Sequence, residues 1–227
     1  MPQILYEDNH LLIINKNPGE IVQGDKTGDI SLCESLKEFI KKRDNKPGNV
    51  FLGVVHRLDR PVGGAVIFAK TSKALTRLNE MLRNGEIHKT YWAITRNRPP
   101  KEEDTLTHYL STNEKINKSH CSSKQKNGAK QAILNYRLLT CGKTLNLLEI
   151  ELITGRKHQI RAQLAAIGCP IRGDLKYGDK RSNPLGDISL LARKIEFVHP
   201  VSKVPISINA PIPNENVWQS ITSDIIS

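Results

Sequence analysis

A run of nine residues, 56–64, constrains the fold of this chain more than any other stretch, because it joins two apolar segments through a tight turn. Residues 54–55 before it and 65–69 after it have the composition of buried strands. Pro61 holds the preceding residue extended, and two adjacent glycines permit a sharp turn or the close approach of a ligand. The pattern predicts two buried strands, with Asp59 at the end of the first, where the chain enters the turn.

Asp59 is the residue of this turn that a purely structural role explains least well. Arg57 and Arg60 flank it, and nearby positive charge favours the ionised form of a carboxyl group. An ionised carboxylate that is held rigidly can act as a nucleophile. An aspartate that caps a turn and pairs with an arginine has the same surroundings, so the local chemistry leaves both interpretations open.

Hydrophobic spacing along the rest of the chain predicts more strands than helices. The capping-box spacing of Ser31 and Glu34 marks the start of one helix. The expected helices span residues 31–43, 72–84 and 156–167, and the expected strands lie within residues 4–16, 87–95, 132–139, 145–153, 190–192, 195–198 and 204–208. Because helices fall between groups of strands rather than after each one, the α+β class is favoured over a doubly wound sheet.

Two polar segments, residues 113–131 and 176–187, are predicted to be loops. The first is rich in lysine and serine, and a loop of that length is commonly functional or disordered. It is either a loop that contacts a ligand and becomes ordered on binding or a solvated insertion.

The charge balance suggests a polyanionic partner. The 227 residues fit one large domain or two small ones, and 34 basic residues against 23 acidic ones leave a net charge of +11. Without a basic amphipathic helix, nucleic acid is favoured over a membrane surface, and neither a membrane span nor a secretory signal is expected. Four unevenly spaced cysteines without a C-x-x-C pair predict reduced thiols, no zinc site and a cytoplasmic location.

Three motifs occur in an order that resembles the RluA-type pseudouridine synthases. They are His56-Arg57-Leu58-Asp59, Lys89-Thr90-Tyr91 and Thr154-Gly155-Arg156-Lys157-His158-Gln159-Ile160-Arg161. The likeness runs from residue 7 to residue 211 and implies a pseudouridine synthase catalytic domain over residues 1–227, undivided or built as two subdomains that share one sheet. The implied sheet is central, mixed and mainly antiparallel, with a few flanking helices and a catalytic cleft across it. No small RNA-binding domain is expected ahead of it, so substrate selection would come from the catalytic domain itself.

The resemblance also implies roles for individual residues. Asp59 would attack the target uridine after the base is flipped out of the RNA. Tyr91 would stack on that base or move a proton from the sugar, whereas a tyrosine in a strand also commonly fills a core. Arg156 would orient Asp59, and Arg57 would hold the RNA open or pair with a carboxylate. The segment from Arg60 to Gly63 departs from the family's usual K-D-T-S, so RNA contacts there are expected to differ.

Arg156 has a physical argument of its own. It lies at the predicted start of a helix, where a cation is disfavoured by about 0.3–1 kcal/mol. Lys157, His158 and Arg161 add positive charge, so an anion is expected to offset the penalty, either Asp59 or RNA phosphate. An ordinary solvated helix start is the alternative, and polar packing is expected of His158 and His56 rather than metal binding. The predicted RNA contacts are Arg57, Arg60, Lys157, His158 and Arg161.

Isomerisation of uridine involves neither redox chemistry nor phosphate cleavage, so no metal and no organic cofactor is expected. The expected partner is ribosomal or transfer RNA, with no membrane, no obligatory protein partner and a monomeric state. One alternative is a catalytically inactive RNA-binding or chaperone module with the same fold. Another is a magnesium-dependent nucleotide hydrolase that uses Asp59, Asp174 and Asp179.

Overall fold

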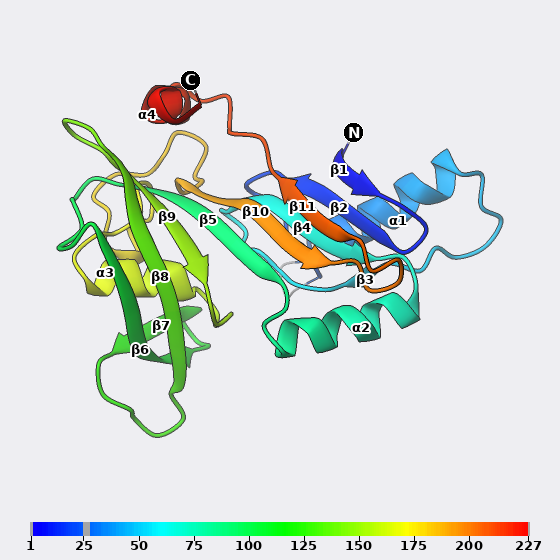
Figure 1. Cartoon of the computed structure of the whole chain (residues 1–227), viewed down its shortest axis with the longest axis horizontal. Helices are drawn as coiled ribbons and strands as arrows, with labels where there is room; N and C mark the ends of the chain where they lie inside the picture. Colours follow the sequence, from blue (N-terminus) through cyan, green and yellow to red (C-terminus); the bar gives the residue numbers. More distant parts are fainter. Residues whose placement is uncertain (1, 25–27, 227) are drawn as a thin grey trace. The chain divides into compact units, whose positions relative to one another are not determined.

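The computed structural model describes residues 2–24 and 28–226 and divides the chain into two compact units (Figure 1). The first unit comprises residues up to Ile87 together with Ala192–Pro211, and the second comprises His88–Leu191 and the C-terminal segment from Ile212. The domain predicted over residues 1–227 includes Met1, residues 25–27 and Ser227, which lie outside the described residues.

The first unit is built around buried antiparallel strands. Its strands are β1 (Gln3–Glu7), β2 (Leu11–Lys16), β3 (Gly53–Val54), β4 (Gly63–Ala69), the greater part of β10 (Leu190–Val198) and β11 (Pro205–Asn209). The order is β1-β2-β4-β10, with β11 on β10 and β3 on β4. All seven residues of β4 are buried, and Phe68 lies opposite Leu12 of β2. Continuous apolar sequence in β2 and β4 therefore corresponds to strands covered on both faces.

Two helices flank these strands in Figure 1, α1 (Leu32–Arg43) and α2 (Ser72–Arg83). Ser31 caps α1 in a complete capping box with Glu34, and α1 buries Leu36 and Ile40. Thr71 caps α2 through its side chain. The helices predicted over residues 31–43 and 72–84 are confirmed to within one residue at each end.

The second unit is a separate antiparallel arrangement with its own helices. Its strands are β5 (His88–Thr95), β6 (Glu103–Asn113), β7 (Lys118–Ser122), β8 (Lys130–Cys141) and β9 (Asn146–Leu152), in the order β5-β9-β8-β6-β7. Helix α3 (Gln159–Ala166) packs on β6 and β7, and α4 (Asn216–Ile226) packs on β8 and β9. A 3-10 turn spans Leu175–Tyr177. The α+β class with mainly antiparallel strands is confirmed.

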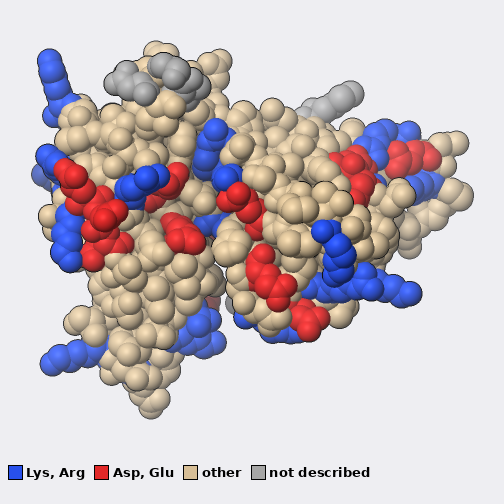
Figure 2. Space-filling model, in the orientation of Figure 1, with Lys and Arg blue, Asp and Glu red and all other residues tan. Residues whose placement is uncertain are grey.

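Acidic and basic side chains alternate over β8 and β9 on the face shown in Figure 2. Arg137 of β8 forms a 2.9 Å ion pair with Glu149 of β9, and Asn135 donates to Glu151 at 2.9 Å. Charges on this face neutralise one another across neighbouring strands. The excess positive charge of the chain therefore lies elsewhere than on these two strands.

Several sequence predictions are wrong in detail. The segment predicted as a loop over residues 113–131 contains β7, and β6 before it was not predicted. Both strands carry mostly polar residues, and β7 is the last strand of the sheet order with β6 between it and β8, where few of their side chains are buried. Residues 190–198 form one strand rather than two.

The two helices of the second unit, α3 and α4, also differ from prediction. The helix expected over residues 156–167 begins three residues later, at Gln159. Helix α4 was missed because its sequence is rich in β-branched residues and serine, which have modest helix propensity. Burial of Trp218 and Ile221 stabilises it instead. In the part of the chain that the structure describes, no helix is long and apolar enough to cross a membrane.

Candidate active site

Asp59 occupies a short turn whose two flanks are anchored in the core of the first unit. The Val62 amide donates to the Asp59 carbonyl at 3.0 Å, and Leu58 and Val62 are buried. Asp59 itself is only partly buried, so its carboxyl group is not enclosed in the interior. The predicted strand end is wrong, because β3 stops at Val54 and an irregular segment leads to the turn. The turn itself and the strand after it are confirmed.

The buried ammonium group of Lys16 clamps this turn by hydrogen bonds to its backbone. Lys16, at the end of β2, is 1% exposed, and its Nζ donates to the carbonyls of Asn17 at 3.0 Å, Arg60 at 3.1 Å and Val62 at 2.7 Å. Burial lowers the pKa of Lys16 to about 8, while the carboxylates of Glu20 and Asp59 act in the opposite direction. The charge of Lys16 therefore acts on the Asp59 carboxylate, and its hydrogen bonds fix the backbone that follows Asp59 in the turn.

The close approach of strand β10 explains why residue 64 is a glycine. Its φ is +116°, a conformation that side-chain-bearing residues rarely adopt, and a Cβ at this position would lie 2.6 Å from the backbone nitrogen of Ala192 on β10. Of the two predicted explanations for the glycines, close approach of a ligand is therefore not required at Gly64. The glycine permits β10 to pack directly against the start of β4.

The other residues of the first motif have distinct surroundings. Arg57 is exposed, and Arg60 forms a 2.7 Å ion pair with Asp29 in which both side chains are about half exposed. His56 accepts a 3.2 Å hydrogen bond from the Ile67 amide through Nε2, which confirms the polar packing predicted for it. Both arginines are accessible at the surface that carries the Asp59 turn.

Tyr91 lies in the second unit, on β5, where it is 6% exposed and faces Ile150 of β9 in register. Lys89 precedes it by two residues and therefore projects from the same face of the strand. The Nζ of Lys89 lies 3.8 Å from the position that a Cβ on Gly155 would occupy. Burial lowers the pKa of Lys89. The second and third sequence motifs thus meet at one end of this unit.

Gln159 holds the Thr154–His158 segment against β8. Its Oε1 accepts from the Arg156 amide at 2.9 Å and lies 2.8 Å from Oγ1 of Thr154, while its Nε2 donates to the Ile133 carbonyl at 3.0 Å. The exposed Arg156 side chain donates through Nε to the Gln131 carbonyl at 3.0 Å. Arg156 lies ahead of the first turn of α3 rather than in it, so the predicted helix-dipole penalty applies to it only weakly.

Two of the residues predicted to contact RNA, Arg161 and His158, are buried and have partners within the protein. Arg161 is buried, and its Nε and Nη2 donate to the two carboxylate oxygens of Asp174 at 2.7 and 2.9 Å. His158 is buried too, and its Nδ1 lies 2.9 Å from the Tyr177 hydroxyl, which is the polar packing expected of it in place of metal binding. Both side chains stabilise the start of α3. Lys157 differs, because it is exposed and forms a 3.1 Å pair with Glu114.

The acids invoked for a magnesium-dependent hydrolase have structural partners. Asp174 accepts from Arg161, and Asp179 accepts from the Gly173 amide at 2.7 Å and from Arg96 at 3.1 Å. Among residues 2–24 and 28–226, no three His, Cys, Asp or Glu side chains are grouped so that they could hold a metal ion. These carboxylates therefore organise the loop after α3.

Sequence reasoning missed the role of Lys16 at the Asp59 turn of the first unit and the roles of Lys89 and Gln159 at the Arg156 segment of the second unit. Lys16 carries a visible signal, since a lysine that closely follows an apolar run such as residues 11–14 must find acceptors if the strand is buried. Gln159 and Lys89 were quoted within motifs, but only the structure connects them to the segment around Arg156. Asp59 belongs to the first unit, and Tyr91 and Arg156 belong to the second.

Comparison with known proteins identifies the family. Residues 10–166, well over half of the chain, match the family model described as RNA pseudouridylate synthase. The chain therefore belongs to the RNA pseudouridylate synthase family, a family of RNA-modifying enzymes.

Named relatives agree with this assignment. An uncharacterized RNA pseudouridine synthase of Bacillus subtilis is 32% identical over 92% of this chain and 68% of its own length. Ribosomal large subunit pseudouridine synthase C of Buchnera aphidicola is 32% identical over 98% of this chain and 70% of its own length. tRNA pseudouridine synthase C of Vibrio cholerae is 32% identical over 99% of this chain and 96% of its own length.

Solved structures support the fold. Human RNA pseudouridylate synthase domain containing 4 superposes with a TM-score of 0.79 at 22% identity, covering 99% of this chain and 93% of its own. Human RNA pseudouridylate synthase domain containing 1 gives a TM-score of 0.75 at 20% identity, over 97% and 87% of the two chains. The chain therefore has the pseudouridine synthase fold.

Proposed function

We propose that this RNA pseudouridine synthase isomerises specific uridines of structured ribosomal or transfer RNA, with Asp59 as its nucleophile. The observation that carries the proposal is the partly buried carboxylate of Asp59 on a turn clamped by the Lys16 ammonium. A nucleophile gains most when its position is fixed before the substrate arrives, because less ordering is then required in the transition state.

In the proposed reaction, a carboxylate oxygen of Asp59 attacks the sugar carbon that bears uracil, and the glycosidic C–N bond breaks. The detached uracil turns, and one of its ring carbons forms a new bond to the same sugar carbon as the bond to Asp59 breaks. The proton on that ring carbon is lost, and the freed ring nitrogen gains one. Atoms and charge balance within the substrate, so product and reactant are isomers.

Residues of the second unit are proposed to assist this chemistry. The largely buried Tyr91 would stack on the flipped base, since the steps above take no proton from the sugar, and Arg156 would orient the carboxylate of Asp59. The exposed Arg57, Arg60 and Lys157 are proposed to bind RNA phosphates, because accessible cations near the motifs lower the free energy of polyanion binding.

The substrate class follows from the names of the relatives, which include ribosomal and transfer RNA enzymes of similar identity. We propose RNA as the partner, without an obligatory protein partner, a monomeric state and a cytoplasmic location. A single catalytic domain containing both units is proposed to carry the activity, with a catalytic cleft that admits the flipped uridine.

The decisive experiment incubates ribosomal and transfer RNA transcripts with wild-type protein and with Asp59→Ala, and then maps pseudouridine. We expect site-specific product with wild type, none with Asp59→Ala, and RNA binding in both. Asp104→Ala, which removes a carboxylate on β6 of the second unit, is the matched control and should retain activity. Product from Asp59→Ala would refute the nucleophile assignment, and RNA binding without product from wild type would favour an inactive binding module.

A further inference from the structure

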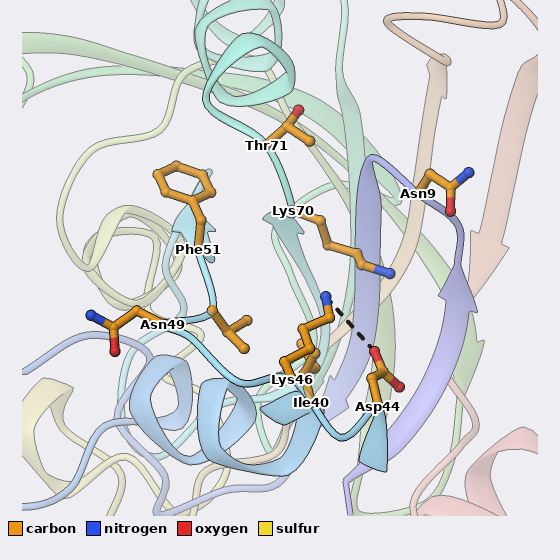
Figure 3. Close-up of a pocket in the computed structure, with 9 residues that line it drawn as sticks. Asn9, Ile40, Asp44, Lys46, Asn49, Phe51, Lys70 and Thr71 are labelled. Atoms are coloured by element: carbon orange, nitrogen blue, oxygen red, sulfur yellow. Dashed lines mark ion pairs between the residues drawn. The ribbon is translucent and has the colours of Figure 1, made fainter. Parts of the chain in front are cut away.

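A second candidate site lies in the first unit, at the end of β4 opposite to the Asp59 turn. There a cavity of about 380 Å³ opens between the β1–β2 turn, the end of α1 and the start of α2 (Figure 3). Lys70 and Thr71, which line it, follow β4, whereas the Asp59 turn precedes that strand. A seven-residue strand separates the two ends by roughly 20 Å, so this cavity is not part of the candidate active site.

The charged side chains at the cavity carry an excess of positive charge. Arg43 binds Glu7 at 2.7 Å and Asp44 at 2.7 Å, Lys70 binds the same Glu7 at 2.7 Å, and Lys46 lies 3.9 Å from the same Asp44. Three cations thus share two carboxylates. Hydrogen bonds from Arg43 and Lys70 lower the pKa of Glu7 to about 2, so the pairing persists at neutral pH. Among the residues that line the cavity, the two cations Lys46 and Lys70 outnumber the one carboxylate, Asp44.

Phe51 provides an aromatic surface beside these cations. Its side chain is 47% exposed, although its neighbour Leu52 is buried, and Phe51 is one of the residues that line the cavity (Figure 3). Asn9 and Asn49 also line the cavity, and the side-chain amide of each can both donate and accept hydrogen bonds. An exposed ring, two amides and a residual positive charge are the groups that bind the base and the phosphate of one nucleotide.

We infer that this cavity binds an unpaired nucleotide of the RNA substrate, with its base stacked on Phe51 and its phosphate near Lys46 and Lys70. The inference rests on the proposed function for the presence of RNA. An unpaired nucleotide is required because only an unstacked base leaves a face free for an aromatic side chain. Lys41 and Lys42, in the last turn of α1, extend the basic surface along which the adjoining backbone would run.

The site gives the enzyme a contact with RNA well away from the nucleophile. RNA bound at both places must present a single-stranded nucleotide at a fixed distance from the target uridine. Selection between RNAs would then depend on this spacing as well as on the sequence around the uridine. Such a requirement adds affinity only when the two sites can be occupied together.

The test measures equilibrium binding of a uridine-containing stem-loop, prepared with and without single-stranded extensions, to four variants. Phe51→Leu should raise Kd for the extended RNA about five- to hundredfold, the range for one lost stacked base, while Phe51→Tyr retains wild-type affinity. Lys46→Gln should lower the slope of log Kd against log salt by about one, because one phosphate contact is lost. Lys143→Gln, which removes an exposed lysine of the second unit, is the charge-matched control and should leave that slope unchanged.

These binding measurements need no catalytic turnover. The inference about the cavity can therefore fail while the proposed function stands, and the proposed function can fail while the cavity still binds RNA. Ultraviolet cross-linking of the extended RNA should additionally label the peptide that contains Phe51. Equal Kd values for wild type and Phe51→Leu on the extended RNA would overturn the inference, as would an equal loss on the RNA without extensions. Binding of uridine monophosphate as tight as that of the extended RNA would also overturn it, in favour of a free-nucleotide site.

Discussion

Replacement of Gly64 by alanine tests whether this glycine is required by the fold rather than by a ligand. At φ +116° an alanine is strained by about 1–3 kcal/mol. Its Cβ would also lie 2.6 Å from the Ala192 backbone nitrogen, and overpacking against immobile backbone costs about 1–3 kcal/mol more. The free energy of unfolding should therefore fall by about 2–6 kcal/mol. Thermal unfolding followed by circular dichroism should show a Tm lower by roughly 4–24 °C.

Two other glycines separate the contributions. Gly85 has φ +74° with open space around it, so Gly85→Ala should cost only the strain, about 1–2 kcal/mol. At Gly63 a Cβ would meet only the Pro18 side chain at 3.2 Å and the Lys16 carbonyl at 3.3 Å, so Gly63→Ala should cost about 1 kcal/mol. If Gly64→Ala unfolds no earlier than Gly85→Ala, the close approach of β10 is not the reason for the glycine.

Three further variants test buried and paired charges. Lys16→Met should lower the free energy of unfolding, measured in urea at pH 7, by about 2 kcal/mol. The lost charge-assisted hydrogen bonds contribute about 1.5–3 kcal/mol each, which exceeds the free energy gained by no longer burying a charge. Equal or higher stability of the variant would contradict this. Arg161→Gln should cost about 3–5 kcal/mol in the same assay by leaving Asp174 buried without its cation. Glu7, whose pKa lies at about 2 instead of 4.5 because of Arg43, should stabilise the fold above pH 5 and lose that effect as pH falls toward 2. Glu7→Gln should therefore flatten the acid side of a plot of Tm against pH, and an unchanged slope would refute the assignment.

Exposed counterparts provide controls for these measurements. Lys157→Gln removes a partner from the Glu114 ion pair at the surface, so it should change stability by no more than about 1 kcal/mol. A similar loss for Lys157→Gln and Arg161→Gln would mean that burial of the Arg161 pair is not what makes it costly to break.

The elements that could be predicted from sequence are those with strong local signals. The capping box at Ser31, the apolar run of β4 and the helical leucine spacing of residues 72–84 each specify structure without distant partners. Strand β6 lacks such a signal, since its polar sequence becomes a strand by pairing with β8. Helix α4 likewise depends on tertiary burial of Trp218.

The candidate site residues, too, were only partly predictable from the sequence. Motif resemblance selected Asp59, Tyr91 and Arg156, but motifs do not reveal which neighbouring side chains serve the protein itself. Arg161 has the same charge and motif context as Arg156, and only burial beside Asp174 distinguishes its role. Lys16 was missed because its three acceptors are carbonyl groups, two of which lie more than forty residues away in the chain.

The clamp formed by Lys16 makes this side chain a built-in reporter of turn motion. Amine acylation requires a neutral amine that reagent can reach, and a pKa of about 8 supplies the neutral form under mild conditions while the closed turn withholds access. The labelling rate of this single lysine therefore counts openings of the segment that carries the nucleophile. Slower labelling in the presence of RNA would measure how far substrate steadies the turn before chemistry begins.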